Sequence, residues 1–358
     1  MKNLFLYICI ITINVQSINA QNSIDTIFLP EITLIESKIK SHSIGSNYDI
    51  INTKIIGKSC TNTLSEYLSS NSSFYIKQYG ALATPTFRGT SSSHSLILWN
   101  GIPINSIANG ILDFSTITIN NFNEIITVNG GNSSIFGSGA MGGTIHINSF
   151  PIYNNERDKI LFTREIGSFG LNSNSIRIQK IKNNLILSAS YLKLYDKNNF
   201  RYTNTTQNGN PTEFNDYGKR KSEEKKIDVL YKFNSNHEFS SSYWYNYLER
   251  EVPQNMTIQN SDAIQYDENT RILISSNHRL NNFDIKLKQA YLKENFRYTE
   301  IIKDIDSRFL AESKITDIDI KLHSKKYLFN IGTMFNNHNI SNNNYIGSQQ
   351  KEQQLAIF

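Results

Sequence analysis

The stretch SIFGSGAMGGTIHINS, residues 134–149, decides how the rest of the chain is interpreted. Gly137, Gly139 and Gly142 have the spacing G-x-G-x-x-G, which is typical of dinucleotide-binding loops. Such a loop requires a helix directly after the glycines, because the helix N-terminus faces the phosphates. Here the glycines run into TIHINS, a strand pattern, and Gly143 stands where a phosphate-binding loop has its lysine. We therefore exclude a nucleotide site and expect the glycines to serve tight turns and close backbone packing.

The first twenty residues, MKNLFLYICIITINVQSINA, are typical of a secretory signal peptide. Lys2 precedes an apolar run, and the small Ala20 precedes Gln21. Without residues 1–20, Cys60 is the only cysteine, so the sequence excludes an internal disulfide. No later stretch reaches about 18 consecutive apolar residues, the length that a membrane-spanning helix needs. The exported protein is therefore expected either to be soluble or to enter a membrane as a β-barrel.

The composition favours strands and turns. The 358 residues include 19 Tyr and 20 Phe but only 6 Pro, and the net charge is +5. The positive charges form no stripe, so no nucleic-acid partner is expected. No nucleophile elbow and no metal-ligand spacing is found, and His94 has no second ligand near it in the sequence. We expect neither an enzyme nor a cofactor.

Residues 44–150 are predicted to form a small α+β domain. TNTLSEYLSS predicts a short helix, because Thr63 and Glu66 have the spacing of a capping box and Leu64, Tyr67 and Leu68 share one face. Short strands are expected in PTFRG, SLILWNGIPI and EIITV, separated by Gly, Asn and Ser turns.

From about residue 158 the pattern has period two. Ile227, Val229 and Tyr231 alternate with Asp228 and other polar residues, and later segments repeat this pattern. A soluble β-sandwich has the same alternation, but the connections favour a transmembrane barrel. Short turns are expected at 183–184, 234–236, 281–282 and 324–325, and they alternate with long polar loops at 196–224, 249–268, 297–313 and 337–352.

Two long motifs then carry a family resemblance. TPTFRGTSSSHSLILWNGIPIN and, further on, VNGGNSSIFGSGAMGGTIHINS resemble the plug domain of TonB-dependent outer-membrane receptors, most similar to cobalamin-receptor-like members. The match covers about residues 55–150. The resemblance implies a small α+β plug domain followed by an antiparallel transmembrane β-barrel. The implied parts are a signal peptide (1–20), an N-terminal segment with the TonB box (21–43), the plug (44–150) and a partial barrel (158–358).

The chain departs from the family pattern in two ways. Ile126 and Asn129 stand where the family usually has an acidic residue and an arginine, which puts a plug–barrel ion pair through them in doubt, and Asn100 replaces an aspartate. The family barrel has 22 strands, whereas residues 158–358 provide nine and the start of a tenth near Leu355. We therefore expect a fragment or the product of a truncated gene.

The resemblance implies an importer in the outer membrane of a Gram-negative bacterium, surrounded by lipid. A scarce nutrient such as cobalamin or an iron–siderophore binds, and periplasmic TonB then pairs with the TonB box by β-augmentation and remodels the plug. From pattern alone, a leader strand packed on the next domain explains the same segment equally well. The expected TonB box is Thr26, Ile27, Phe28, Leu29, Pro30, Glu31, Ile32, Thr33 and Leu34.

Structural roles in the plug are expected for Arg88, Gly89, Asn100, Gly101, Gly130, Gly137, Gly139, Gly142 and Gly143. Ligand contacts are expected in two apex loops, at Gln78, Tyr79, Asn105 and Asn109. The rival interpretations are a secreted soluble β-rich adhesin or binding module and a non-functional receptor remnant. A passive porin fits less well, because a porin has no need of a plug.

Overall fold

The computed structural model describes residues 47–52, 60–79, 81–87, 89–130, 136–150, 158–253, 255–257, 262–324, 326–344 and 349–358. By its internal contacts the chain divides into residues 1–32 and 33–358, and every described residue lies in the second unit. The expected signal peptide, the expected TonB box and Arg88 lie outside the described residues. No helix in the described part is long and apolar enough to cross a membrane.

The plug domain is a five-stranded sheet with a helix and a hairpin beside it. The sheet order is β1-β6-β7-β4-β5, in which β4 and β7 are parallel and the other pairs are antiparallel. The elements are β1 (Asn47–Asn52), α3 (Leu64–Asn71), β2 (Tyr75–Tyr79), β3 (Leu82–Thr86), η2 (Ser92–His94), β4 (Ser95–Trp99), β5 (Ile102–Pro103), η3 (Phe114–Thr116), η4 (Ile119–Asn121), β6 (Glu124–Asn129), η5 (Ser138–Ala140) and β7 (Gly143–Asn148).

The helix α3 begins as the sequence predicts. The Thr63 side chain accepts from the Glu66 amide, and the Glu66 carboxylate accepts from the Thr63 amide, so the capping box is complete. Leu64, Tyr67 and Leu68 are buried. The strand expected in PTFRG is displaced, because β3 spans Leu82–Thr86 and pairs with β2.

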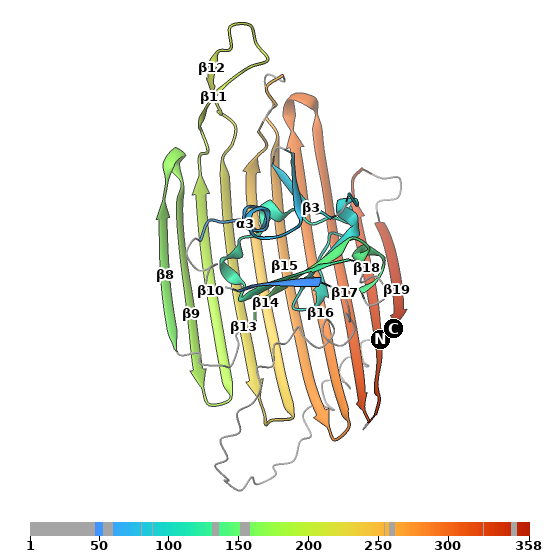
Figure 1. Ribbon diagram of the computed structural model, residues 1–358. Helices are drawn as coiled ribbons and strands as arrows, with labels where there is room; N and C mark the ends of the chain where they lie inside the picture. Colours follow the sequence, from blue (N-terminus) through green and yellow to red (C-terminus); the bar gives the residue numbers. More distant parts are fainter. Residues whose placement is uncertain are drawn as a thin grey trace. The chain divides into compact units, whose positions relative to one another are not determined.

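The rest of the described chain forms one ten-stranded antiparallel sheet, the wall (Figure 1). Each wall strand pairs with the wall strand that precedes it in the chain. The wall strands are β8 (Lys159–Ile166), β9 (Asn172–Lys182), β10 (Leu185–Asp196), β13 (Arg220–Lys232), β14 (His237–Glu251), β15 (Ile264–Leu280), β16 (Phe283–Glu300), β17 (Ile305–His323), β18 (Leu328–Asn342) and β19 (Gln349–Ile357). The remaining elements are the small hairpin β11 (Arg201–Thr203) and β12 (Thr212–Phe214) and the 3-10 turns η6 (Ser168–Gly170) and η7 (Ile301–Lys303).

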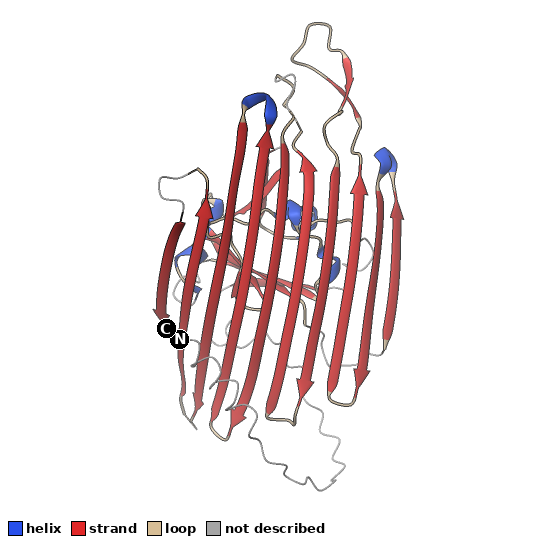
Figure 2. Ribbon diagram, turned by 180° about the vertical axis from the view of Figure 1, so that it is seen from behind, coloured by secondary structure: helices blue, strands red, loops and turns tan. Residues whose placement is uncertain are grey.

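Short turns join wall strands at one end, which we call the short-turn end, and most connections at the other end are longer (Figure 2). The turns expected near 183, 235 and 281 are confirmed. The prediction of a long loop at 297–313 is wrong. Strand β16 continues to Glu300, β17 begins at Ile305, and the turn η7 joins them. These strands have 18 and 19 residues, whereas about 9–11 residues are enough for a strand to span a membrane. Their halves toward the longer connections mix charged residues such as Arg297 and Arg308 with few apolar ones, and this pattern predicts a loop.

The two faces of the wall differ in a way that distinguishes a membrane barrel from a soluble sandwich. The inner face, on which the plug packs, is rich in buried polar residues, among them Glu224, Lys226, Asp228, Asp317 and Asp319. The outer face exposes large apolar residues in consecutive strands, among them Ile160, Phe162, Ile178, Leu187, Ile227, Ile274, Ile320, Ile331, Phe335 and Leu355. A soluble sandwich buries its apolar face, so this distribution fits a barrel with lipid outside.

One apolar core links the plug to the wall. Trp99 of β4 and Trp244 of β14 are both fully buried, and their rings lie 5.6 Å apart between centroids. Phe122 approaches Trp244 edge-on at 5.4 Å. Wall residues including Leu273, Ile315 and Met334 belong to the same buried cluster as the plug core.

Candidate ligand-binding site

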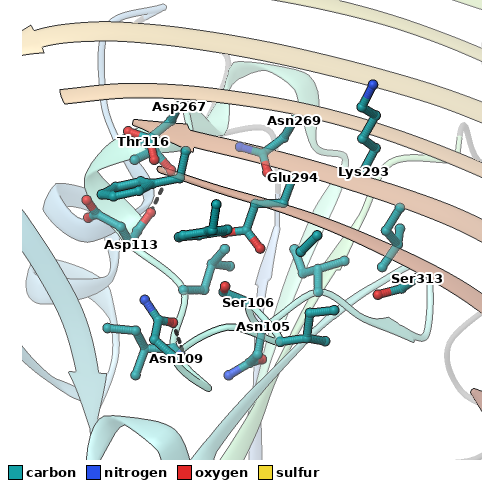
Figure 3. A pocket seen from close by; sticks show the side chains of 18 of the residues that line it. Asn105, Ser106, Asn109, Asp113, Thr116, Asp267, Asn269, Lys293, Glu294 and Ser313 are labelled. Atoms are coloured by element: carbon teal, nitrogen blue, oxygen red, sulfur yellow. Dashed lines mark hydrogen bonds between the residues drawn. The ribbon is translucent and has the colours of Figure 1, made fainter. Parts of the chain in front are cut away.

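A cavity of about 250 Å³ lies between the plug and the inner face of β15–β17 (Figure 3). The plug contributes the segment 104–116, and the wall contributes the parts of β15, β16 and β17 toward the end with the longer connections. The polar residues that line it include Asn105, Ser106, Asn109, Asp113, Asp267, Asn269, Arg271 and Glu294. Phe296 and Phe309 add a stacked aromatic pair, with ring centroids 4.9 Å apart and planes 15° apart.

Asn105 and Asn109 shape the plug side of the cavity. The Asn105 amide accepts from the Ile97 backbone at 2.8 Å and donates to the Ser95 and Gly110 carbonyls. Asn109 accepts from the amide of Ile111, two residues on. Both expected ligand contacts therefore line the cavity, with much of their hydrogen-bonding capacity used to hold the loop.

Gln78 and Tyr79 lie elsewhere, at the end of β2, and do not line this cavity. Tyr79 is 62% exposed, and the Lys77 ammonium lies 4.6 Å from the centre of its ring. The first expected apex loop reaches this cavity through Leu82, and not through the two residues expected to contact ligand.

More carboxylate groups than cationic groups are placed to contact a ligand in the cavity. Asp267 accepts from Gln265 at 2.8 Å, and Glu294 hydrogen-bonds to Ser106. Arg271 donates to Asn246 at 2.9 Å and lies 4.2 Å over the Trp244 ring, so its guanidinium is already engaged. Lys293 points away from the cavity in Figure 3. The lining is therefore suited to groups that donate hydrogen bonds.

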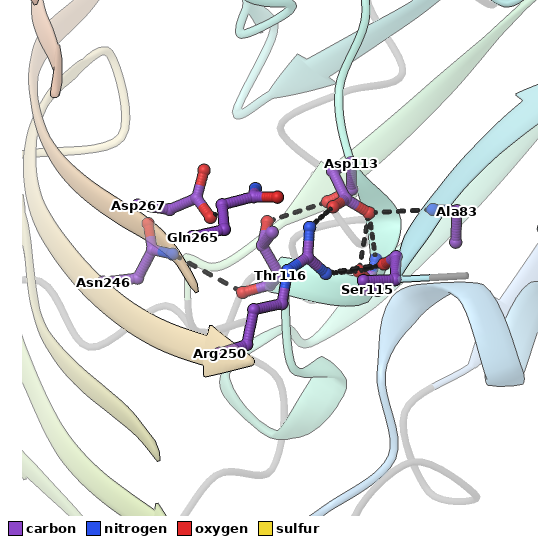
Figure 4. A network of polar contacts seen from close by, with 9 residues as sticks. Ala83, Asp113, Ser115, Thr116, Asn246, Arg250, Gln265 and Asp267 are labelled. Atoms are coloured by element: carbon purple, nitrogen blue, oxygen red, sulfur yellow. Dashed lines mark hydrogen bonds and ion pairs between the residues drawn. The ribbon is translucent and has the colours of Figure 1, made fainter. Parts of the chain in front are cut away.

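An ion pair beside the cavity ties the plug to the wall (Figure 4). Arg250 of β14 donates to Asp113 at 2.5 Å, and to Ser115 Oγ and the Ala81 carbonyl at 2.6 Å each. Asp113 in turn accepts from the amides of Ala83 and Ser115 at 3.0 Å. We call these contacts the Asp113–Arg250 clamp, which joins β3, η3 and β14 at one point.

Several other wall side chains bond to the plug backbone. Glu224 accepts from the Thr118 amide at 3.1 Å, Lys288 donates to the Asn100 carbonyl at 2.9 Å, and Glu165 accepts from the Cys60 amide at 2.8 Å. The plug–wall ion pair questioned at Ile126 and Asn129 is thus replaced elsewhere, at Asp113 and Arg250. Neither residue was predicted from the sequence. The available signal was the charge of Arg250 at a position of β14 that faces the plug.

The predicted plug residues occupy turns and tight contacts. Asn100 and Gly101 both have positive φ, 48° and 83°, which suits a two-residue Asn-Gly turn between β4 and β5. A Cβ on Gly143 would lie 2.7 Å from the Val128 carbonyl oxygen. Positive φ is also found at Gly89, Gly130 and Gly137, whereas Gly139 and Gly142 lie against Leu96 and Thr90.

The comparisons with known proteins agree with this arrangement. Residues 40–144 match the family TonB-dependent Receptor Plug Domain. Residues 40–144 thus carry a TonB-dependent receptor plug domain, and the wall follows it in the chain. The chain is 35% identical over 111 residues to the vitamin B12 transporter BtuB of Vibrio cholerae O1, and this match covers 30% of this chain and 18% of the relative. BtuB of Vibrio vulnificus YJ016 is 39% identical over 72 residues, 20% of this chain and 12% of the relative.

A solved siderophore receptor and a solved iron transporter share the fold at low sequence identity. The siderophore receptor PiuA from Acinetobacter baumannii aligns with a TM-score of 0.64 at 13% identity, over 87% of this chain and 53% of that receptor. The FrpB iron transporter from Neisseria meningitidis aligns with a TM-score of 0.67 at 12% identity, over 84% and 48%. The chain thus spans about half the length of these receptors.

Proposed function

We propose that the chain is the plug-bearing part of an outer-membrane receptor that imports a scarce nutrient by energy-coupled plug remodelling, without a catalytic step. The observation that carries this proposal is the cavity between the plug and β15–β17, flanked by the Asp113–Arg250 clamp. A ligand there touches the plug and the wall at once, so its binding energy acts on the contacts that hold them together.

The outer face supports a place in the outer membrane of a Gram-negative bacterium, reached by way of the signal peptide at residues 1–20. On β16, Phe283 and Tyr291 are eight residues apart. That separation is about 27 Å along the strand, or about 21 Å across a bilayer at a tilt of about 40°. Aromatic rows flank the exposed apolar band, with Phe233, Phe283 and Tyr327 at the short-turn end. Outer-membrane barrels have such a band, about 25 Å tall.

The cavity chemistry favours cobalamin over an anionic iron–siderophore. Asp267 and Glu294 face the cavity, while Asp113 and Arg250 pair with each other in the clamp and Arg271 donates to Asn246. A negatively charged chelate is repelled by such a lining, whereas the carboxamide groups around a corrin ring donate to carboxylates. The plug relatives named vitamin B12 transporter agree with this choice.

Periplasmic TonB is the proposed energy-coupling partner. Residues 26–34 have an apolar, strand-forming sequence around Pro30, which is of the kind that pairs with a sheet edge. Ile32→Pro removes a backbone donor in this segment and is expected to abolish energy-dependent uptake while ligand binding persists. Unchanged uptake would place the TonB box elsewhere.

Binding and uptake are tested with cells that express the chain. Labelled cyanocobalamin is expected to bind to their outer membranes and to accumulate only when TonB is present. Glu294→Gln is expected to weaken binding by about tenfold, because a charged acceptor becomes neutral. Lys293→Gln, whose side chain points away from the cavity, is the matched control (Figure 3).

Three outcomes would contradict the proposal. Recovery of the protein from a salt-washed soluble fraction would favour the secreted adhesin. Tight binding of an anionic ferric chelate without cobalamin binding would support a receptor function but contradict cobalamin as its ligand. Binding that neither Glu294→Gln nor Asp267→Asn alters would reject the cavity.

A further inference from the structure

Two histidines lie against each other on the outer face of the wall, near the short-turn end. His237 is the first residue of β14, and His278 lies two residues before the end of β15. They are directly opposite in register, with 2.9 Å between the two Nδ1 atoms and 5.2 Å between ring centroids. The plug packs on the other face, so neither the cavity nor the clamp uses this pair.

The backbone holds the two rings close together. The Arg279 amide donates to the Asn236 carbonyl at 2.8 Å, so residues 236 and 279 form a hydrogen-bonded pair of the ladder. The next pair, His237 and His278, is then of the non-hydrogen-bonded kind, in which opposite side chains approach most closely. The Phe233 amide donates to the His237 carbonyl at 2.9 Å and closes the turn before β14. The backbone thus already holds both imidazole rings close enough to bind one ligand.

We propose that His237 and His278 form a two-imidazole site for a divalent transition-metal ion of tetragonal preference, Cu²⁺ in the first place. Two metal–nitrogen bonds of about 2.05 Å at a right angle separate the nitrogens by about 2.9 Å, whereas a tetrahedral angle needs about 3.3 Å. The hydrogen bond between the rings already holds the two Nδ1 atoms 2.9 Å apart, the separation that a right angle needs, so the rings need only turn for both lone pairs to converge on one ion. Imidazole nitrogens suit copper and nickel, and copper binds most tightly in the divalent series.

Metal binding here replaces one hydrogen bond and needs no other reactant. Without metal, one Nδ1–H donates to the other Nδ1. With metal, both neutral rings carry their proton on Nε2 and offer the Nδ1 lone pair, so no net proton is released. Among the described residues no group of three or more His, Cys, Asp or Glu is placed to hold a metal. Water completes the coordination, and the ion joins β14 to β15 at the aqueous edge of the apolar band.

The test is a copper(II) titration of the detergent-solubilised full chain, followed by electron paramagnetic resonance. The wild type is expected to bind one Cu²⁺ with two nitrogen ligands. His237→Ala and His278→Ala are each expected to lower affinity by at least about tenfold, given that loss of a supporting contact alone costs 10–100-fold. His237→Asn and His278→Asn keep a polar side chain of similar size and serve if an alanine variant folds poorly.

The control is His323→Ala, because His323 is exposed and bonds to Asp284 rather than to a second histidine. It is expected to leave copper binding unchanged. Equal copper affinity in the His237→Ala/His278→Ala double variant would place the ion elsewhere and overturn the site. Zinc binding as tight as copper binding would overturn the tetragonal assignment.

Discussion

His146 is a titratable residue enclosed in the plug sheet. It is 2% exposed on β7, and its Nε2 lies 2.9 Å from Thr144 Oγ1. Burial and, secondarily, the positive charge of Lys288 lower the pKa of His146 from 6.5 to about 3. The imidazole is therefore neutral in the folded protein at neutral pH.

This burial predicts acid sensitivity. Between pH 6.5 and about 3, His146 is protonated in the unfolded chain but neutral in the folded chain. Across that window the free energy of unfolding falls by about 1.4 kcal/mol per pH unit from this residue. His146→Gln is expected to remove that part of the slope in urea denaturation followed by circular dichroism. An unchanged slope would contradict the assignment.

Gly143 predicts a packing defect. A Cβ there would lie 2.7 Å from the Val128 carbonyl oxygen and 3.1 Å from the Phe74 ring. Gly143→Ala is expected to lower the free energy of unfolding by about 1–3 kcal/mol. Ser69→Ala, on the exposed side of α3, is the control and is expected to have little effect. Equal stability of the Gly143 variant and wild type in urea would show that β6 and β7 yield to the extra methyl group.

The sequence predicted local roles of residues, such as turns and helix caps, better than it predicted which distant residues contact each other. The glycine spacing and the capping box at Thr63 could be interpreted from sequence because turns and caps depend on neighbouring residues. Asp113 and Arg250 are separated by 136 intervening residues, so no local pattern pairs them. Asn100 is a departure from the family pattern that the turn accommodates, since asparagine tolerates positive φ.

At the scale of elements, the Asp113–Arg250 clamp is expected to dominate plug attachment at the cavity end. The Arg250 and Asp113 side chains are 6% and 12% exposed. Arg250→Gln leaves a buried carboxylate without its cation, which costs about 3–5 kcal/mol. Limited proteolysis is expected to cut the segment 81–83 faster in this variant.

A neighbouring exposed pair provides the control. Lys221 and Glu249 lie 2.7 Å apart, with side chains 54% and 30% exposed. Lys221→Gln is expected to change stability by about 0–1 kcal/mol, as for exposed pairs in general, and to leave proteolysis unchanged. Equal cleavage of the two variants would show that the apolar core, and not the clamp, holds this end of the plug.

Strand existence was predictable, but strand ends were not. The alternation of apolar and polar residues predicted strands β13–β18, because one face of each is apolar over part of its length. It failed beyond that part, where exposed charged residues such as Arg297 and Arg308 interrupt the apolar pattern. There the pairing of β16 with both β15 and β17 maintains the strand, and pairing partners are a non-local property.

At the scale of the whole molecule, the exposed apolar band predicts where charge is tolerated. Ile274 is 45% exposed on the outer face of β15, within the band. Ile274→Arg is expected to destabilise the membrane-inserted protein by about 2–4 kcal/mol. Glu268→Arg, farther along β15 toward the longer connections, is expected to have a much smaller effect. Heat-modifiability of the outer-membrane protein on gels measures both, and equal behaviour would contradict the position of the band.

The contact between Trp99 and Trp244 has an optical consequence. These are the two tryptophans of the sequence, one on the plug and one on the wall, with ring centroids 5.6 Å apart. Arg271 also lies over the Trp244 ring, so the indole emission depends on a charge held at the cavity. Any withdrawal of the plug separates the two indoles and admits water between them. The native chain thus carries a label-free fluorescent reporter of plug displacement, and Trp244→Phe isolates the signal of Trp99.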